Sequence, residues 1–422
     1  MSGTITINAN DLINATYNQL YNKLYPQLKS QITKEPEVAQ QPYSYIIWTD
    51  GTNYYAKNGQ TGQIEFSGTD ACKVIQQAIN ALPNYYSGVI NIKAGTYVCR
   101  SLINVPSGDI HFEIRGEGLH NTILSFETNE TFDQLRGAIT VISNDFYNDP
   151  PFGLSTAPVS GLGVSAFLGI RDLTLWVKDP NLNGIVLSKI PRLIIQNVRI
   201  KGYYTDTVPP FTPNTAGLYV YLSFNSEINI IENLITTGFT TGINIFLDHA
   251  ILIGVQSARV RVGMKLNGYD VVAIRPHVYL VHEVAYELVG KGTGITLICP
   301  KAEGPTSSYA VVFKIPSDQT PIANIYGLTT YGTFASLINT PYQNIRFYGL
   351  GWQASGVATI PTGSTRVTIS HGLVTTPNKV LITPLAQPPG KLWVENITST
   401  SFDIVTDTAP TTNLNIAWNA EV

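Results

Sequence analysis

Charged residues are scarce in this chain: they make up 13% of its 422 residues, whereas an average soluble domain carries about 25%. The 26 Lys and Arg nearly balance the 29 Asp and Glu, which gives a formal charge of −3. Nucleic-acid-binding proteins carry an excess of basic residues, so we expect no nucleic-acid partner. Hydrophobic residues still reach 44%, which is enough to bury a core and excludes a disordered chain.

Long hydrophobic segments are absent as well. No run approaches the roughly 20 apolar residues that cross a bilayer, so we expect no membrane insertion. The N-terminus, Met1 to Thr6, has neither a basic nor an apolar region, and we predict no signal peptide.

Cysteine is the third shortage. Cys72, Cys99 and Cys299 are few and lack the spacing of a metal site. We therefore expect each to be a small buried residue rather than a ligand or a nucleophile. We expect no metal and no cofactor.

Residues 1–43 are predicted to form a helical segment followed by a polar linker. One face of the helix is apolar, with spacings of 4, 3, 4 and 4 between Ile13, Tyr17, Leu20, Leu24 and Leu28. This face either packs on its own domain or forms a short coiled-coil seam between subunits. Because the segment precedes the main domain, we favour the seam.

A hairpin and a helix are expected next, within 44–87. Two apolar runs flank the turn residues Asp50 and Gly51, which predicts a β-hairpin. Residues 67–70 can cap a helix that runs to about Leu82 and buries an apolar face.

Short apolar runs that begin with a small residue recur from there on. The small residues are Gly184, Gly217, Gly242, Gly263, Ala285, Ala310 and Ala335. Their intervals are 33, 25, 21, 22, 25 and 25, and an insertion at 203–215 accounts for the longest. A period of 20 to 25 residues made of short strands is typical of a solenoid. The leucine framework and asparagine ladder of leucine-rich repeats are absent, so the pattern predicts a right-handed parallel β-helix, with the helix at 70–82 closing its N-terminal end.

The period stops after Trp352. Residues 353–422 contain five or six alternating strands with turn residues every 10 to 12 positions, which predicts a small antiparallel β-sandwich. The fold class is therefore all-β, with domains expected at 1–43, 44–352 and 353–422.

Residues 45–124 carry motifs that resemble the pectate-lyase-like β-helix superfamily, in versions from thermophilic archaea and viruses. The motifs are Tyr45-Ile46-Ile47-Trp48, Ser67-Gly68-Thr69-Asp70, Ala94-Gly95-Thr96-Tyr97 and Gly116-Glu117-Gly118. The final 60 residues resemble a small domain that closes viral tail fibres and spikes, through Val367-Thr368-Ile369-Ser370-His371-Gly372-Leu373 and Asn415-Ile416-Ala417-Trp418. The superfamily includes polysaccharide lyases, glycoside hydrolases and trimeric virus spikes.

The order helix, β-helix, sandwich is the order of a spike. The resemblance therefore implies a tailspike-like virion surface protein, made in the host cytoplasm, that attaches to a host cell-surface glycan. We expect a homotrimer of an archaeal, thermophilic and acidophilic virus, bound to other virion proteins through residues 1–43. The alternative is a β-helix polysaccharide lyase or glycoside hydrolase, and the sequence leaves catalysis undecided.

Candidate catalytic residues are few. Asp248-His249 resembles an Asp-His element of pectate lyases, and Arg275 lies 27 residues after Asp248, roughly one coil later. Glu232 could pair with Asp248 as the two carboxylates of a hydrolase. We favour the simpler interpretation, a surface Asp–His pair without a catalytic role, and the 16-residue spacing of Glu232 and Asp248 is short of a full coil.

Glycan binding requires less, namely aromatic faces with amide or hydroxyl partners. A platform is predicted near the insertion, made of Trp176, Tyr203, Tyr204, Tyr219 and Tyr221. Packing within the shaft or at a trimer interface is the alternative use of these rings.

The low charge also suggests life in acid. Carboxylates lose their charge below a pH of about 4. A chain with few of them should fold with little dependence on their ionisation, so we predict a melting temperature that changes little between pH 3 and 7.

Overall fold

A computed structural model describes residues 43–82, 87–106, 111–142, 167–188, 190, 192–204, 213–223, 229–304, 310–331, 334, 336–338, 345–348, 353–373 and 376–422. They fall into two compact units. One lies within Glu35–Ala323 and includes Leu328–Ile345; the other includes Asn324–Gly327 and Arg346–Val422. The predicted N-terminal helix with its seam, and most of the insertion at 203–215, lie outside the described residues.

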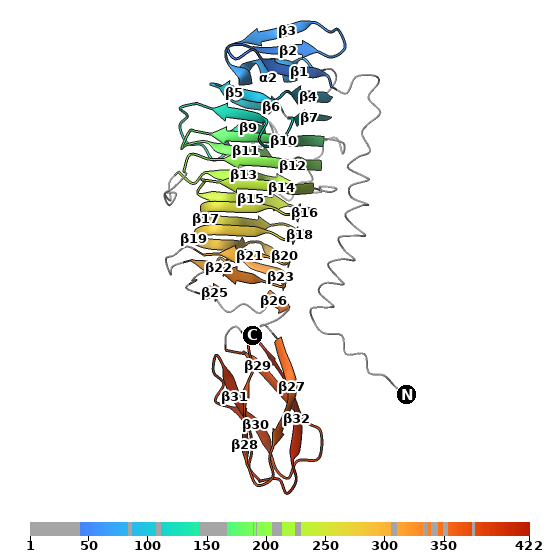
Figure 1. Ribbon diagram of the computed structural model, residues 1–422, viewed down its shortest axis with the longest axis vertical. Helices are drawn as coiled ribbons and strands as arrows, with labels where there is room; N and C mark the ends of the chain where they lie inside the picture. The colour runs from blue at the N-terminus through green and yellow to red at the C-terminus, as the bar shows by residue number, and fades with distance from the viewer. Residues whose placement is uncertain are drawn as a thin grey trace, which may run out of the picture. The chain divides into compact units, whose positions relative to one another are not determined.

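The fold is all-β, as predicted: a right-handed parallel β-helix, a short helix at its N-terminal end, and a small antiparallel β-sandwich (Figure 1). Among the described residues, no helix is long and apolar enough to cross a membrane.

The β-helix opens with three antiparallel strands, β1 (Tyr45–Thr49), β2 (Tyr54–Asn58) and β3 (Ile64–Gly68). The predicted turn joins β1 to β2, where the side chain of Asp50 accepts hydrogen bonds from the backbone amides of Thr52 and Asn53. Strand β1 also pairs in parallel with the first coil, so the hairpin is continuous with the β-helix.

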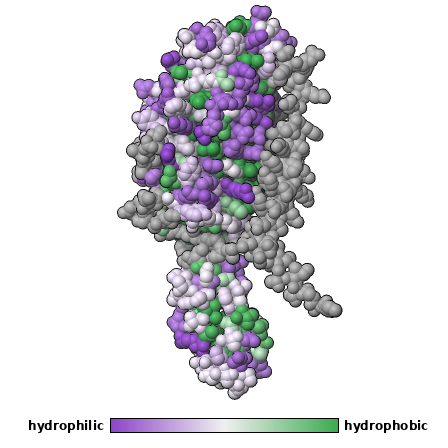
Figure 2. Space-filling model, in the orientation of Figure 1, coloured by the Kyte–Doolittle hydropathy of each residue, from purple (hydrophilic) through white to green (hydrophobic). Residues whose placement is uncertain are grey.

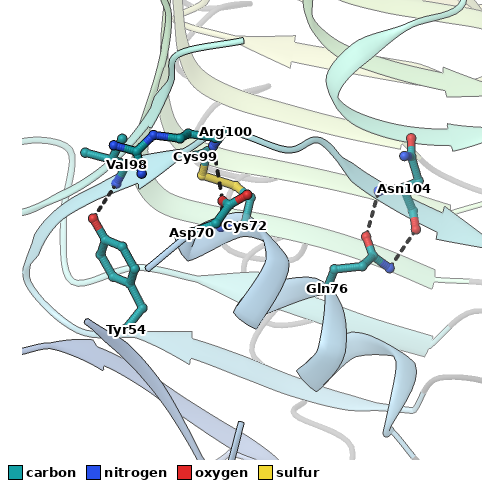
Figure 3. The surroundings of a disulfide bond; sticks show 8 residues. All are labelled: Tyr54, Asp70, Cys72, Gln76, Val98, Cys99, Arg100 and Asn104. Atoms are coloured by element: carbon teal, nitrogen blue, oxygen red, sulfur yellow. Dashed lines mark hydrogen bonds between the residues drawn. A yellow bond between two sulfur atoms is a disulfide. The ribbon is translucent and has the colours of Figure 1, made fainter. Parts of the chain in front are cut away.

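Helix α2 (Ala71–Asn80) follows, and Asp70 caps it by accepting from the backbone N–H of Cys72. Its apolar face is buried against β2 to β6, which confirms the predicted closing helix. Figure 3 shows how the helix is attached: a disulfide joins Cys72 to Cys99, and the side-chain amide of Gln76 pairs with both backbone groups of Asn104 at 2.8 and 2.9 Å. Cys72 and Cys99 are buried as expected, but their pairing was not predicted.

Each coil contributes to three parallel faces of the β-helix. The first face contains β4 (Gly88–Ile92), β7 (His111–Arg115), the first half of β10 (Phe167–Val177), β12 (Arg192–Lys201) and β14 (Asn229–Thr237), then β16 (Ala250–Ile253), β18 (Val271–Ile274), β20 (Lys291–Ile298), β23 (Thr320–Tyr326) and β26 (Ile345–Tyr348). The second face contains β5 (Gly95–Cys99), β8 (Thr122–Phe126), the second halves of β10, β12 and β14, the starts of β17 (Gln256–Asn267) and β19 (His277–Leu288), then β21 (Lys301–Glu303) and β24 (Thr329–Tyr331). The third face contains β6 (Ile103–Pro106), β9 (Gly137–Ile142), β11 (Asn183–Ser188), β13 (Ala216–Ser223), β15 (Thr241–Leu247), the ends of β17 and β19, β22 (Val311–Lys314) and β25 (Ser336–Ile338).

The interior is a stack of aliphatic side chains in register. On the first face, Ile114, Ile170, Ile195 and Ile231 occupy one column and each is fully buried. Alternate residues of every strand face inward, which explains the predominance of Ile, Val and Leu in the apolar runs.

The repeated glycines, Gly184, Gly217, Gly242 and Gly263, form a column on the third face, which Ala285 continues. A Cβ on Gly217 would lie 2.7 Å from the carbonyl oxygen of Gly242 and 2.9 Å from Thr236, and one on Gly263 would lie 2.4 Å from the carbonyl of Ala285. Successive coils therefore approach too closely for a side chain at the glycines of this column, which is the physical reason for glycine in that part of the repeat.

A side-chain ladder lies at the corner between the first and second faces. Asp172, Asn197 and Asn233 all have positive φ, between 50 and 57°. The amide of Asn233 donates to Asn197 at 2.9 Å, and the amide of Asn197 donates to Asp172 at 2.9 Å. The repeat analysis did not predict this ladder.

The C-terminal unit contains two three-stranded sheets. One has the order β27 (Gln353–Ile360), β32 (Leu414–Glu421), β29 (Lys379–Pro384); the other has the order β28 (Arg366–Ser370), β31 (Ser401–Thr406), β30 (Leu392–Glu395). Their core includes the fully buried Ile360, Phe402, Ile404 and Ile416. All predicted strands of the sandwich are present.

Candidate functional site

Trp176 lies on the outer surface of the second face, because its neighbours Leu175 and Val177 are buried inside the β-helix. Two ammonium groups lie over its ring: Nζ of Lys178 is 4.5 Å and Nζ of Lys201 is 4.1 Å from the centroid. Lys178 also pairs with Glu127 at 2.6 Å and lowers the pKa of that carboxyl by hydrogen bonding. We call Trp176, Lys178, Lys201 and Glu127 the Trp176 cluster.

Two of the four predicted tyrosines lie on a different face from this cluster. Tyr219 and Tyr221 belong to β13 on the third face, with ring centroids 6.2 Å apart. Tyr219 is 7% exposed, and burial raises its pKa to about 12. Its hydroxyl accepts a hydrogen bond from Gln134 at 3.0 Å, so packing accounts for this ring.

Tyr203 and Tyr204 follow the end of β12, with their rings edge to face at 5.3 Å. Tyr203 is half exposed, whereas burial raises the pKa of Tyr204. Residues 205–212, which follow Tyr204, lie outside the described part of the chain.

The candidate catalytic residues lie at opposite ends of the first face. Asp248 and His249 form the corner before β16, whereas Glu232 lies at the end of the first-face segment of β14 and Arg275 directly follows β18. One coil in this region has 21 residues, as in the pair Ile251 and Val272. Arg275 lies 27 residues after Asp248, which is more than one coil, so the two residues lie at different corners of the β-helix.

Local contacts explain these residues individually. Asp248 is buried, and its carboxylate accepts from the backbone N–H of Tyr269 at 3.4 Å. His249 faces Asp270 at 3.6 Å, and both side chains are exposed. Glu232 accepts a hydrogen bond from Gln196 at 2.6 Å on the outer surface of the first face. The structure does not assemble these groups into a pair of facing carboxylates.

A polar and aromatic group that the sequence analysis missed lies farther along the second face. Strands β19, β21 and β24 place His277 beside Lys301, and Tyr279 beside Glu303 and Tyr331. The side chains point outward, because the intervening Val278 and Ala302 are fully buried inside. We call these five residues the Glu303 cluster.

Glu303 is the centre of this cluster. Its Oε1 lies 2.5 Å from Nζ of Lys301 and 3.1 Å from Nε2 of His277. The hydrogen bond from Lys301 lowers the pKa of Glu303, while burial, reinforced by the charge of Lys301, lowers the pKa of His277. The same ammonium lies 4.8 Å from the ring centroid of Tyr331, a residue that is 55% exposed. Glu303 is thus ionised and His277 neutral near pH 7.

The two clusters occupy a single column of residues. Strand register connects them in the order Trp176, Lys201, Thr237, Ala258, Tyr279, Glu303, Tyr331. With a rung spacing of about 4.8 Å, the six steps span roughly 29 Å. The adjacent outward column lies two residues earlier on each strand. It contains, in order, Arg199, Ile235, Gln256, His277 and Lys301.

Charge along this surface is mostly positive. The two clusters and Arg199 contribute four cations, Lys178, Lys201, Arg199 and Lys301, against the two carboxylates Glu127 and Glu303. The chain as a whole has a formal charge of −3. The described residues contain no group of three or more His, Cys, Asp or Glu side chains placed to hold a metal ion.

The β-helix fold has distant counterparts among solved structures. The chain is similar to the ORF18 protein of Geobacillus virus E2, at 12% identity and a TM-score of 0.38, covering 94% of this chain and 89% of that one. It is similar to a tailspike protein of Acinetobacter baumannii bacteriophage Fri1, named as a capsular polysaccharide depolymerase, at 10% identity and a TM-score of 0.34, covering 83% and 82%. A pectin methylesterase in complex with a hexasaccharide matches at 11% identity and a TM-score of 0.31, covering 65% and 88%.

No family model matches the chain. No curated protein matches it either. At this level of identity and overlap, the structural likenesses assign no function.

Proposed function

We propose that the chain is a spike-type attachment protein that binds an anionic surface polysaccharide along the second face of its β-helix. The observation that carries the proposal is the register that places Trp176, Lys201, Tyr279, Glu303 and Tyr331 in one outward column. A linear polymer requires contacts repeated along one direction, and the regular rungs of a β-helix supply that repetition.

Each kind of side chain in the column suits one part of an acidic sugar. The half-exposed ring of Tyr331 offers an apolar surface to the C–H face of a sugar ring. The Trp176 ring holds the ammonium groups of Lys178 and Lys201 at this surface by cation–π contacts. Lys201, Arg199 and Lys301 attract carboxylate substituents, and an arginine fork can bind one in a bidentate manner. Glu303 accepts hydrogen bonds from sugar hydroxyls, since the Lys301 contact keeps it ionised.

The virion location, the homotrimer and attachment through residues 1–43 are proposed from the order of the segments alone. The disulfide between Cys72 and Cys99 supports a destination outside a reducing cytosol, because such bonds persist in oxidising surroundings. Cleavage of the glycan is a separate hypothesis. The ionised Glu303 is better suited to accept hydrogen bonds than to protonate a leaving group.

Binding of the full chain to polygalacturonate and alginate, with dextran as the neutral polymer, tests the proposal. We expect binding to the two polyuronates that weakens as salt is added, because the contacts are partly ionic. Trp176→Ala and Tyr331→Ala should each weaken binding roughly tenfold, equivalent to about 1.4 kcal/mol.

Tyr269→Ala is the matched control, since Tyr269 is also exposed but lies at the corner before the first face. Equal losses in all three variants, or equal binding to dextran, would overturn the proposal. New reducing or unsaturated ends in the same polyuronates would demonstrate the enzymatic alternative.

A further inference from the structure

The sandwich has one outer sheet surface with an unusual composition. On the sheet β28–β31–β30, the outward positions are Arg366, Val405 and Trp393 in one row and Thr368, Asp403 and Glu395 in the next. Trp393 is 39% exposed, which is rare for so large a ring in a well-packed domain. Hydrophobic residues appear among polar ones on the part of this unit drawn in Figure 2.

The Trp393 ring is held in one orientation. Its Nε1–H donates to Oε2 of Glu395 at 3.0 Å. Val405 faces outward directly between Trp393 and Arg366, yet it is only 7% exposed. The side chains that flank Val405 therefore cover it, while 39% of Trp393 stays exposed to solvent.

A hydrogen-bonded charge network fixes the polar groups beside the ring. Arg366 contacts Asp403 at 2.7 Å through Nη1 and Glu395 at 2.5 Å through Nη2. Asp403 also accepts from Thr368 at 2.6 Å and from Asn396 at 2.8 Å, and the hydrogen bond from Thr368 contributes most to its lowered pKa. Glu395 and Arg366 keep solvent-exposed surface, at 35% and 48% of their side chains.

We propose that this surface, Trp393 with Glu395 and Arg366, is a second saccharide-binding site, specific for a neutral pyranose. A ring fixed before binding loses little conformational entropy when a sugar stacks on it. The carboxylate and the guanidinium beside the ring can accept from and donate to adjacent sugar hydroxyls. Two carboxylates surround the one arginine, which disfavours an acidic sugar here and distinguishes this site from the cationic second face.

The opposite sheet of the sandwich provides a control surface. There the exposed apolar side chains are Val357, Leu381 and Leu385, at 54 to 62% exposure. Leu381 pairs with Asn419 on the outer side of β29. These aliphatic groups offer no flat π surface for stacking.

Affinity electrophoresis of the full chain in gels that contain a neutral β-glucan, galactomannan or galactan tests the site. We expect retardation by at least one of the three polymers, unchanged by added salt. Trp393→Ala should weaken it at least about tenfold and Trp393→Phe less, because the phenyl ring still covers Val405 but lacks the N–H bonded to Glu395.

Leu381→Ala should retain full retardation, and Trp176→Ala should as well, since it belongs to the polyuronate surface. Trp393→Ala should conversely leave polyuronate binding unchanged, so the two proposals can fail separately. The melting temperature of Trp393→Ala reports whether the sandwich is folded, and Trp393→Phe supplies the test if it is not. Absence of retardation in all three gels, or equal retardation of the wild type and both Trp393 variants, would overturn the inference.

Discussion

The disulfide between Cys72 and Cys99 joins the closing helix α2 to strand β5 of the first coil. The two residues are 27 positions apart. Cross-linking a loop of that length restricts the unfolded chain and is worth roughly 3 to 4 kcal/mol in the chain-entropy model. An unclosed end would expose the strand edges of the first coil, so the bond stabilises a vulnerable part of the β-helix.

We therefore expect the double variant Cys72→Ala, Cys99→Ala to unfold at a lower urea concentration than the wild type. Reductant should bring the wild type to the midpoint of the double variant and leave the double variant unchanged. Cys299→Ala is the control, because Cys299 is a free thiol. A midpoint that does not move with reductant would show that the bond contributes nothing.

The column of small residues gives a second prediction. Gly217→Ala places a Cβ within 2.7 Å of a backbone carbonyl that cannot move without displacing the next coil. We expect a loss of about 1 to 3 kcal/mol, the usual cost of overpacking. Gly294→Ala is the matched control, since its added Cβ would meet only Asp270 at 3.5 Å. Equal unfolding midpoints for both variants in urea would contradict the close approach of the coils.

Two substitutions at Asn197 separate the contribution of the side-chain hydrogen bonds in the ladder Asp172–Asn197–Asn233 from that of the backbone conformation. Asn197→Ala loses both ladder hydrogen bonds and also places alanine at a φ of 52°, which costs about 1 to 2 kcal/mol by itself. Asn197→Gly loses the same bonds but accommodates the positive φ. We expect both variants to be less stable than the wild type, with alanine the lower of the two. If glycine is as stable as asparagine in urea denaturation, the ladder hydrogen bonds add nothing.

Much of the fold was predictable because its signals are local. Asp50-Gly51 specifies its turn within four residues, and Asp70 caps a helix whose apolar face can be read from one window. The glycine column was visible as a repeat because the same steric demand recurs at Gly184, Gly217, Gly242 and Gly263. The sandwich strands alternate over short distances and were found for the same reason.

What the sequence did not predict depends on register between coils of unequal length. His277 and Lys301 are 24 residues apart, whereas Lys301 and Thr329 are 28 apart, so no single period aligns the Glu303 cluster. A uniform coil length also misplaced Arg275 relative to Asp248. The Cys72–Cys99 bond and the asparagine ladder were missed in the same way, since each joins residues across a coil whose length the sequence does not state.

Trp393 was missed for a different reason. Its exposure depends on which side of β30 faces outward, and the short strand Leu392–Glu395 contains apolar residues on both sides. Packing decides the orientation: Leu392 and Val394 lie against the sandwich core, which leaves Trp393 facing outward in register with Val405.

Acid stability provides the last prediction, and here the structure favours the opposite of the sequence-based expectation. The hydrogen bond that the backbone N–H of Asn53 donates to Asp50, with those from Tyr55 and Thr52, lowers the pKa of Asp50 to about 2. Hydrogen bonds also lower the pKa of Glu117, Glu127 and Asp403. A carboxyl group with a lowered folded pKa stabilises the protein above its unfolded pKa, and this contribution is lost as the pH falls through the folded value. Stability should therefore decrease between about pH 5 and pH 2.

Two histidines act in the same direction at higher pH. Burial lowers the pKa of His277 and of His282 below the ordinary 6.5, so the unfolded chain binds their protons first and acidification below about pH 6.5 also favours unfolding. Calorimetry at constant ionic strength should show a melting temperature that falls steadily from pH 7 to pH 3. Asp403→Asn should reduce the slope on the acid side, because it removes one carboxyl group whose pKa is lowered in the folded state. A melting temperature that is flat across this range would instead restore the expectation drawn from the low charge.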